Sequence, residues 1–416
     1  MSTLEIANLR ASSSAIRLQF PALLRRDGGE AVAYFDGPGG TQVPRVVVDA
    51  VADYLMHHNA NTHWAYPTSA ETDVLLEEAR AAAADLLGGA PDEMVFGANM
   101  TTLTFHLARA LGRAWGPGDE VVVTELDHHG NVAPWCALER ERGLTMRVVR
   151  MVADTGQLDW QDLERKITPR CRLLAIGAAS NALGTINDVA RATRLARAVG
   201  ALVFVDAVHY APHASIDVKS LDCDFLGCSA YKFYGPHVGL LWLRRDLLNA
   251  LDAPKLIPAP DVGPERLETG TLSHEGMVGT AAALDFLASL GHGADRPARL
   301  KAAFATLHER SAAQLRRLWE GLADMAHVRL YGPPPGVPRT PTLGFTVNGM
   351  RSSEVARHLA RRAVYVSHGD FFAHTVIERL GLQPEGLVRA GCACYTTDEE
   401  VERLLASVAA LERMAN

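Results

Sequence analysis

The sequence contains no apolar run long enough to cross a lipid bilayer, which takes about 18 consecutive apolar residues. The N-terminal stretch MSTLEIANLRASSSAIRLQF also lacks the apolar core of a secretory signal peptide. These two absences argue against a membrane protein and against a secreted one. We therefore expect a soluble, cytoplasmic protein that does not bind membranes.

Cysteine is scarce, with six residues in a chain of 416. The cysteines form no Cys-x-x-Cys pair, and no group of histidines has zinc-finger spacing. The sequence therefore indicates reduced thiols, without a disulfide framework or a metal site. The six residues are Cys136, Cys171, Cys223, Cys228, Cys392 and Cys394.

An excess of positive charge is also absent. The chain has 41 Lys and Arg residues against 48 Asp and Glu residues, a net charge of −7 at pH 7. A mildly acidic protein produces no field that attracts phosphate groups. Nucleic acid is therefore excluded as the default partner.

The residues that are present indicate a large α/β protein. The chain is 48% hydrophobic and 21% charged, which is typical of globular proteins, and its length favours two or more domains. From about residue 70, segments of helical period alternate with short apolar segments, as in βαβ units. The expected strands are residues 94–96, 120–124, 145–149, 172–177, 202–206, 224–228 and 239–243.

The pattern changes after Leu290, where the sequence GHGADRP precedes a long helical stretch over residues 300–322. Strands expected at residues 327–330 and 343–347, and a helix at 353–362, follow it. We predict an N-terminal segment (1–30) that packs on the small domain, a large domain (31–290) and a smaller α+β C-terminal domain (291–416).

Two charged residues stand out in the segment after residue 202. Asp206 ends an apolar strand, at the edge where open α/β sheets bind ligands, and Lys232 lies between the next two expected strands. Aromatic neighbours would lower the pKa of a buried lysine and make its amine nucleophilic. An exposed lysine in a turn is the alternative interpretation.

The order of motifs resembles one family over nearly the whole chain, from FDGPGGTQVP to VRAGCACYTTDEEVERLL. The segment Ser229-Ala230-Tyr231-Lys232-Phe233-Tyr234-Gly235-Pro236 matches the Ser-x-x-Lys…Tyr-Gly-Pro motif of pyridoxal-phosphate (PLP) enzymes of the class V aminotransferase group. The match is closest to the cysteine desulfurase and selenocysteine lyase branch. The resemblance implies fold type I, with a large, mostly parallel sheet domain and a smaller α+β domain.

The resemblance also implies three catalytic residues. Lys232 would bind PLP covalently, and Asp206 would keep the pyridine nitrogen protonated so that the ring accepts electrons. His128 in ELDHHGNVAPW would stack over the cofactor ring and move protons.

Further residues match family positions that bind the phosphate. Thr101 and Thr102, in GANMTTLTF, would hold it at a helix start, where amide groups and the helix dipole favour an anion. Ser229 would assist them. Thr271 in ETGTLSHEG matches a threonine that reaches the phosphate of the neighbouring subunit, which implies a homodimer.

The remaining matches concern the cofactor ring and the substrate. By resemblance, Asn181 lies near the ring oxygen or the substrate, and His209 takes the place of a glutamine that hydrogen-bonds that oxygen. Tyr231 replaces the family's histidine beside the cofactor. Arg389 in GLVRAGC would bind the substrate carboxylate, with His63 on the substrate side, in a segment where Trp64 replaces an arginine.

One departure from the family bears on the reaction. Desulfurases carry a persulfide-forming cysteine on a loop, and the corresponding stretch VYVSHGDFFAHTVIERLG has none. Cys392 and Cys394 follow Arg389 on an expected strand, where they would face the core. We therefore predict a desulfurase-like lyase that cleaves a C–S bond, or another bond to a β-substituent, of an amino acid without a persulfide cysteine.

Other functions use the same residues. A class V aminotransferase or an amino-acid epimerase would share the PLP site, and the motifs do not separate these reactions. A non-catalytic sulfur-transfer scaffold is disfavoured, because binding alone does not require Lys232, Asp206, His128 and Arg389 together.

Overall fold

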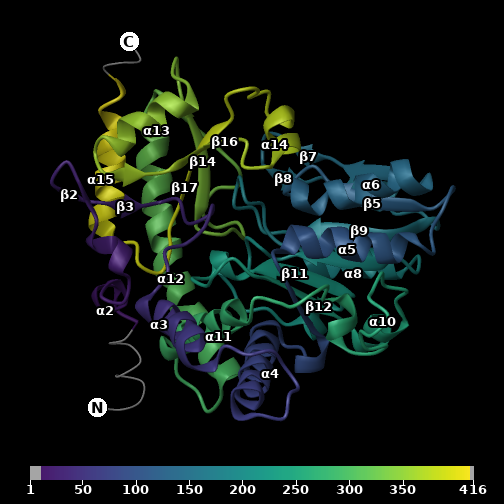
Figure 1. The fold of residues 1–416 in the computed structure, drawn as a ribbon. Helices are drawn as coiled ribbons and strands as arrows, with labels where there is room; N and C mark the ends of the chain where they lie inside the picture. The colour runs from purple at the N-terminus through teal and green to yellow at the C-terminus, as the bar shows by residue number, and fades with distance from the viewer. Residues whose placement is uncertain (1–10, 413–416) are drawn as a thin grey trace.

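A seven-stranded sheet forms the centre of the larger half of the molecule (Figure 1), in a computed structural model that describes residues 11–412. All of its strands are parallel except β12, which is antiparallel to both of its neighbours. This sheet confirms the predicted α/β class. The strands, in spatial order, are β4 (Met94–Gly97), β12 (Gly239–Leu243), β11 (Phe225–Ser229), β10 (Leu202–Asp206), β9 (Cys171–Gly177), β5 (Glu120–Thr124) and β6 (Thr145–Val149).

Helices cover both faces of this sheet, which explains why its strands are almost continuously apolar. In β10, Val203 and Val205 join the core beneath α8 and α11, whereas Phe204 joins the core beneath α5 and α6. Successive side chains thus point to opposite faces. The helices are α3 (Arg45–Asp53), α4 (Pro67–Leu87), α5 (Met100–Gly112), α6 (Ala133–Arg142), α7 (Trp160–Lys166), α8 (Val189–Arg197), α9 (Val218–Leu221), α10 (Arg245–Ala250) and α11 (His274–Ser289).

The smaller half contains a four-stranded antiparallel sheet and the C-terminal helices. Its strands, in spatial order, are β13 (Val328–Tyr331), β14 (Thr342–Val347), β17 (Leu387–Gly391) and β16 (Ser367–Gly369). Its helices are α12 (Arg296–Ala323), α13 (Ser352–Ala360), α14 (His374–Arg379) and α15 (Asp398–Ala409).

Helix α12 belongs to both halves. Leu300 and Phe304, in its first part, pack in the core of the large sheet, whereas Leu315 and Leu318 pack in the core of the small one. Its 28 residues span about 42 Å at 1.5 Å per residue, enough to connect two cores. The helix therefore fixes the two halves against each other.

The N-terminal segment contacts both halves as well. After α2 (Ser13–Arg17), Phe20 packs in the large core, while the Arg17 guanidinium pairs with Glu400 of α15 at 2.9 Å. Strand β3 (Ala33–Tyr34) pairs with β15 (Val364–Tyr365) of the smaller half, although we assigned it to the large domain. Residues 1–10 of the expected N-terminal segment lie outside the described residues.

The remaining short strands are β1 (Arg26–Asp27), β2 (Glu30–Ala31), β7 (Met151–Val152) and β8 (Gln157–Leu158).

Helix α4 begins at Pro67, because proline is favoured in the first turn of a helix. Local structure differs from the sequence expectation near the C-terminus. Strand β17 ends at Gly391, so Cys392 and Cys394 follow the strand, contrary to the prediction, although both are buried.

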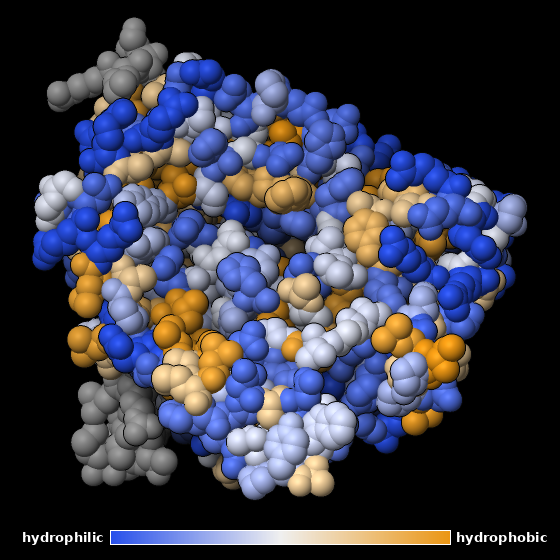
Figure 2. All heavy atoms as spheres, viewed as in Figure 1, coloured by the Kyte–Doolittle hydropathy of each residue, from blue (hydrophilic) through white to orange (hydrophobic). Residues whose placement is uncertain are grey.

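The outer surface is mainly polar on the face seen in Figure 2, with apolar residues in small groups. No helix within residues 11–412 combines the length and the apolar character needed to span a membrane.

Candidate active site

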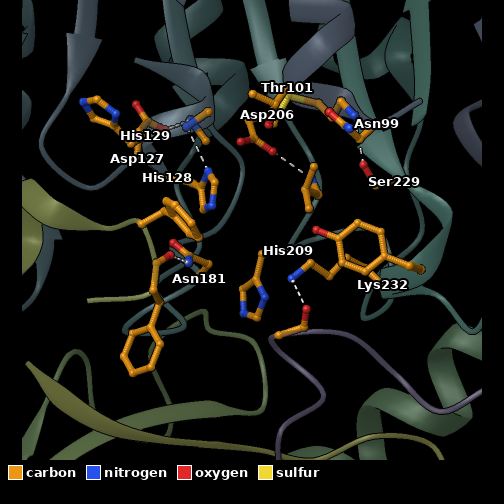
Figure 3. A pocket seen from close by; sticks show the side chains of 18 of the residues that line it. Asn99, Thr101, Asp127, His128, His129, Asn181, Asp206, His209, Ser229 and Lys232 are labelled. Atoms are coloured by element: carbon orange, nitrogen blue, oxygen red, sulfur yellow. Dashed lines mark hydrogen bonds between the residues drawn. The ribbon is translucent and has the colours of Figure 1, made fainter. Parts of the chain in front are cut away.

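A cavity of about 710 Å³ lies where the two halves meet, at the carboxyl ends of β5, β9 and β10. Open α/β sheets bind ligands at this edge. Asp127, His128 and Asp206 line it from the large half, and Phe371 and Arg389 from the small half. Figure 3 shows the polar side chains converging on a common space.

Lys232 follows β11 and is only 9% exposed. Its Nζ donates hydrogen bonds to the carbonyl oxygens of Pro38, at 2.5 Å, and Gly39, at 3.0 Å. Burial and the positive charge of Arg389 lower the pKa of Lys232 to about 7, against the opposing effect of Asp206. A substantial share of the amine is therefore neutral at pH 7 and able to act as a nucleophile.

Asp206 is the last residue of β10, and its Oδ1 accepts a hydrogen bond from the Val208 N–H at 2.9 Å (Figure 3). Burial raises the pKa of this carboxyl to about 6. No Lys, Arg or His side chain within residues 11–412 forms an ion pair with it. A cationic group inside the cavity would supply the missing partner.

Asp127 is a second buried carboxylate beside Asp206, and the sequence reasoning missed it. It accepts hydrogen bonds from the Thr124 hydroxyl, at 2.9 Å, and from the Gly177 N–H. Burial, reinforced by the charge of Asp206, raises the pKa of Asp127 to about 7. The acidic position between strand β5 and His128 was its only signal in the sequence.

His128 follows the turn after strand β5 and lines the cavity. Its Nδ1 accepts a hydrogen bond from the Gly130 N–H at 2.9 Å, which leaves the proton of the neutral ring on Nε2. Burial and the charge of Lys232 lower the pKa of His128 to about 4. A side chain at Gly130 would place its Cβ 2.7 Å from the Thr101 hydroxyl, so only glycine allows this approach.

The start of α5 forms one end of the cavity. Asn99 caps this helix by accepting from the Thr102 N–H at 2.9 Å, and Ser229 accepts from the Met100 N–H at 3.1 Å. Thr101 faces the cavity together with Ser229. Thr102 is exposed and turns toward a neighbouring cavity. A helix start with hydroxyl groups is suited to an anion such as phosphate.

Four of the predicted ring and substrate residues line the main cavity, namely Arg389, Asn181, His209 and Tyr231. The buried Arg389 donates from Nη1 to the Asn181 carbonyl at 2.9 Å, and the Asn181 Nδ2 donates to the Phe371 carbonyl at 2.9 Å. His209 Nε2 lies 3.0 Å from the Thr340 hydroxyl, which links the two halves. Tyr231 stacks on His237, with ring centroids 5.0 Å apart.

Three predicted residues do not line this cavity in the single chain, namely Thr102, His63 and Thr271. The His63 side chain is 81% exposed and pairs with Asp73 at 3.2 Å. Thr271 lines the neighbouring cavity together with Thr102, and His237 lines both cavities. The cross-subunit role of Thr271 stays a prediction.

Phe371 and Phe372 occupy the stretch without cysteine, and both line the main cavity. The Phe371 ring centroid lies 4.0 Å from the Arg389 guanidinium carbon, and the Phe372 ring lies 5.5 Å from the His128 ring. The sequence reasoning noted these residues without assigning them a role, because nothing in the sequence indicated which way the rings point.

The unsatisfied groups of the cavity fit PLP. Asp206 lacks a cationic partner, as a pyridinium site requires, and the buried Asn181 Oδ1 and Arg389 Nε lack hydrogen-bond partners among the described residues. Lys232 offers the amine, and the start of α5 offers a phosphate site. Within residues 11–412, no cluster of three or more His, Cys, Asp or Glu side chains could hold a metal ion.

Comparison with known proteins agrees with this fit. The family model "Aminotransferase class-V" matches residues 33–404. The chain is 32% identical to a cysteine desulfurase of Dickeya dadantii, over 96% of both chains. The apo structure of a cysteine desulfurase from Thermococcus onnurineus superimposes with a TM-score of 0.87 at 29% identity, covering 96% of this chain and 98% of that one.

A C-DES variant with glycine covalently linked to its PLP cofactor has the same fold, with a TM-score of 0.80 at 22% identity, over 94% of this chain and 98% of that one. The chain therefore belongs to the class V aminotransferase family, as a cysteine desulfurase-like enzyme whose cofactor is PLP.

Proposed function

We propose that this enzyme is a lyase that eliminates the β-substituent of an amino acid, preferably by cleaving a C–S bond, without a persulfide cysteine. The observation that carries the proposal is that none of the six cysteines lines the cavity. At the corresponding loop stand Phe371 and Phe372, which have no nucleophilic atom.

The cysteines after β17 are poor substitutes for the missing nucleophile. Cys392 and Cys394 are 2% and 5% exposed. Burial raises the pKa of each thiol to about 12, so almost no thiolate forms at neutral pH. Without a thiolate to attack the sulfur, the sulfur leaves with the electron pair of the C–S bond.

The chain's own residues can carry the elimination. Bound PLP supplies a ring that accepts electrons from the substrate α-carbon. Arg389 would bind the α-carboxylate, and the Nζ of Lys232 would accept the proton from the α-carbon. Asp206 would keep a proton on the pyridine nitrogen, and His128 lines the same cavity with its proton on Nε2.

We further propose that Thr101 and Ser229 bind the phosphate, that Asn181, His209 and Tyr231 surround the cofactor ring, and that Thr271 reaches the site of a second copy of the chain in a homodimer. Support comes from the position of the first five around one cavity and of Thr271 in the adjacent one.

The test is a panel of amino acids with and without β-leaving groups, incubated with the purified holoenzyme. We expect a keto acid and equimolar ammonia from substrates with a β-leaving group and no product from alanine. Transfer of the amino group to an added keto acid would show an aminotransferase, and loss of chirality without a keto acid would show an epimerase. Either result would reject the proposal.

A further inference from the structure

The loop between β16 and α14 is tied to the large half at two points. The Asn181 Nδ2 donates to the Phe371 carbonyl at 2.9 Å, and the His129 N–H donates to the Phe372 carbonyl at 2.7 Å. Within the loop, the Asp370 carboxylate accepts from the Phe372 N–H at 3.0 Å. The loop is therefore held in one position relative to the large half.

This position requires a strained backbone. Phe371 and Phe372 have φ values of 57° and 56°, in the left-handed region that bulky side chains rarely adopt. Strain of this kind is retained mainly at functional sites. The hydrogen bonds to Asn181 and His129 hold the backbone in it.

The strain at Phe372 does not serve to bury apolar surface, although the Phe371 ring packs against the apolar cluster around Leu183 and Ile377. Phe372 is 71% exposed at the edge of the cavity, with its ring 5.5 Å from that of His128. Phe371 is half-buried and covers the Arg389 guanidinium at 4.0 Å. Together with Ala133, Ala179 and Val208, the two rings add apolar surface to the cavity lining.

Because Phe371 covers the Arg389 guanidinium at 4.0 Å, a substrate held there through its carboxylate lies beside the loop, in the cavity that both rings line. We propose that Phe371 and Phe372 form an apolar subsite for the β-substituent, so that the enzyme prefers cysteine conjugates with an apolar or aromatic group on sulfur. This inference rests on the proposed elimination for its chemistry and on the loop geometry for its specificity.

The reaction is balanced without an oxidant or reductant. The Cα–H and Cβ–S bonds break, and sulfur leaves as the thiol after gaining a proton. The remaining three-carbon enamine tautomerises to an imine, and one water molecule hydrolyses it to pyruvate and ammonia. The overall change is conjugate plus water to thiol, pyruvate and ammonia.

The test compares S-benzylcysteine with S-methylcysteine, which share the thioether and differ in the group on sulfur. We expect the wild-type holoenzyme to favour the benzyl compound by about tenfold or more in kcat/KM, as apolar pockets discriminate by size. Phe372→Asn keeps a residue that tolerates positive φ while removing the ring. It should lower kcat/KM for S-benzylcysteine by about tenfold more than for S-methylcysteine, which abolishes the preference.

Ile257→Ala is the matched control, because Ile257 is 98% exposed and does not line the cavity. This variant should keep the wild-type preference. Equal kcat/KM values for the two compounds in the wild type would overturn the subsite, as would an equal loss on both in Phe372→Asn.

A binding measurement separates failure of the subsite from failure of the elimination. Phenylalanine and alanine have no β-leaving group, and each can be titrated while the visible absorbance of the bound cofactor is followed. We expect phenylalanine to bind more tightly, and Phe372→Asn to remove the difference. This result without any keto acid from the thioethers would retain the subsite and reject the elimination, whereas equal binding would reject the subsite.

Discussion

At the residue scale, Lys232 shows how an ordinary side chain becomes reactive. Its amine lies among backbone carbonyls and beside a buried arginine, and Asp206 compensates only part of the cost of burying its charge. The same burial raises the pKa of Asp206. The pKa of Lys232 is lowered and that of Asp206 is raised, so burial favours the neutral form of both groups.

This shift predicts how the cofactor-free protein reacts with PLP. Only the neutral amine attacks an aldehyde, and the pKa of Lys232 is lowered from its ordinary 10.5 to about 7. The rate of covalent cofactor binding should therefore rise through pH 7 and level off above pH 8. Stopped-flow absorbance across pH 5.5 to 9 measures it. A rate that keeps rising toward pH 10 would show an unshifted lysine.

The sequence predicted several polar residues of this cavity because each of them belongs to a motif of its own, whereas Asp127 was missed. Lys232, Asp206, His128 and Arg389 do line one cavity. One step along a helix rotates a side chain by about 100°, so Thr101 and Thr102 point in different directions. The sequence did not indicate which of the two faces the cavity. The Phe371 and Phe372 rings depend on contacts to Asn181 and His129, far away in the chain, which no local pattern contains.

At the element scale, the strands were predictable because both faces of the large sheet are covered, which requires apolar residues at every position. Element ends were less predictable, since they depend on tertiary contacts. Strand β17 ends at Gly391, where a Cβ would lie 2.3 Å from Pro38 of a segment more than 350 residues earlier in the chain. We expected the strand to continue through Cys392 and Cys394, because the local sequence does not indicate the contact with Pro38.

A buried ion pair links helix α4 to the edge of the large sheet, in addition to its apolar packing. Arg80 forms two hydrogen bonds of 2.7 Å with Glu268, which also accepts from the Phe96 N–H of β4. Arg80→Met leaves the carboxylate buried without its cation, so we expect a loss of roughly 3–5 kcal/mol in unfolding free energy. Urea unfolding followed by circular dichroism measures it.

Arg113→Met provides the control for this ion pair. Arg113 pairs with Asp252, and both side chains are largely exposed, at 46% and 74%. Exposed pairs contribute about 0–1 kcal/mol, so this variant should unfold nearly as the wild type does. A similar loss in both variants would contradict the assignment of the buried pair.

In the strained loop, we expect a substitution to increase the unfolding free energy. Phe372→Asn should increase the unfolding free energy by about 1 kcal/mol, because asparagine tolerates positive φ better and little apolar surface is lost. Thermal unfolding of the cofactor-free protein gives the comparison. A clear loss of stability would mean that the ring packs in the fold and is not displayed to the cavity.

At the scale of the whole molecule, the site exists only because the two halves are fixed together. Helix α12 joins their cores, and the contacts His209–Thr340 and Asn181–Arg389 cross the cavity between them. The small half therefore contributes Phe371, Phe372 and Arg389 to a cavity built at the carboxyl edge of the large sheet.

The position of Thr271 leads to a prediction about assembly. It lines a cavity next to the main one, so a second copy of the chain could place it at the partner's phosphate site. Sedimentation should show a dimer of the 44.9 kDa chain. Lys232→Ala and Thr271→Ala proteins, each inactive or weak alone, should regain activity when mixed under conditions of subunit exchange. An active monomer would rule out a composite site.

The central claim is that sulfur leaves by elimination and not by transfer to a cysteine. The most direct measurement is the three-carbon product from cysteine and from S-benzylcysteine, together with the intact mass of the protein after turnover. We expect pyruvate and ammonia, an unchanged protein mass, and the same products from Cys392→Ala/Cys394→Ala. Alanine as the product from cysteine, with a sulfur atom added to the protein and lost in that double variant, would contradict the claim.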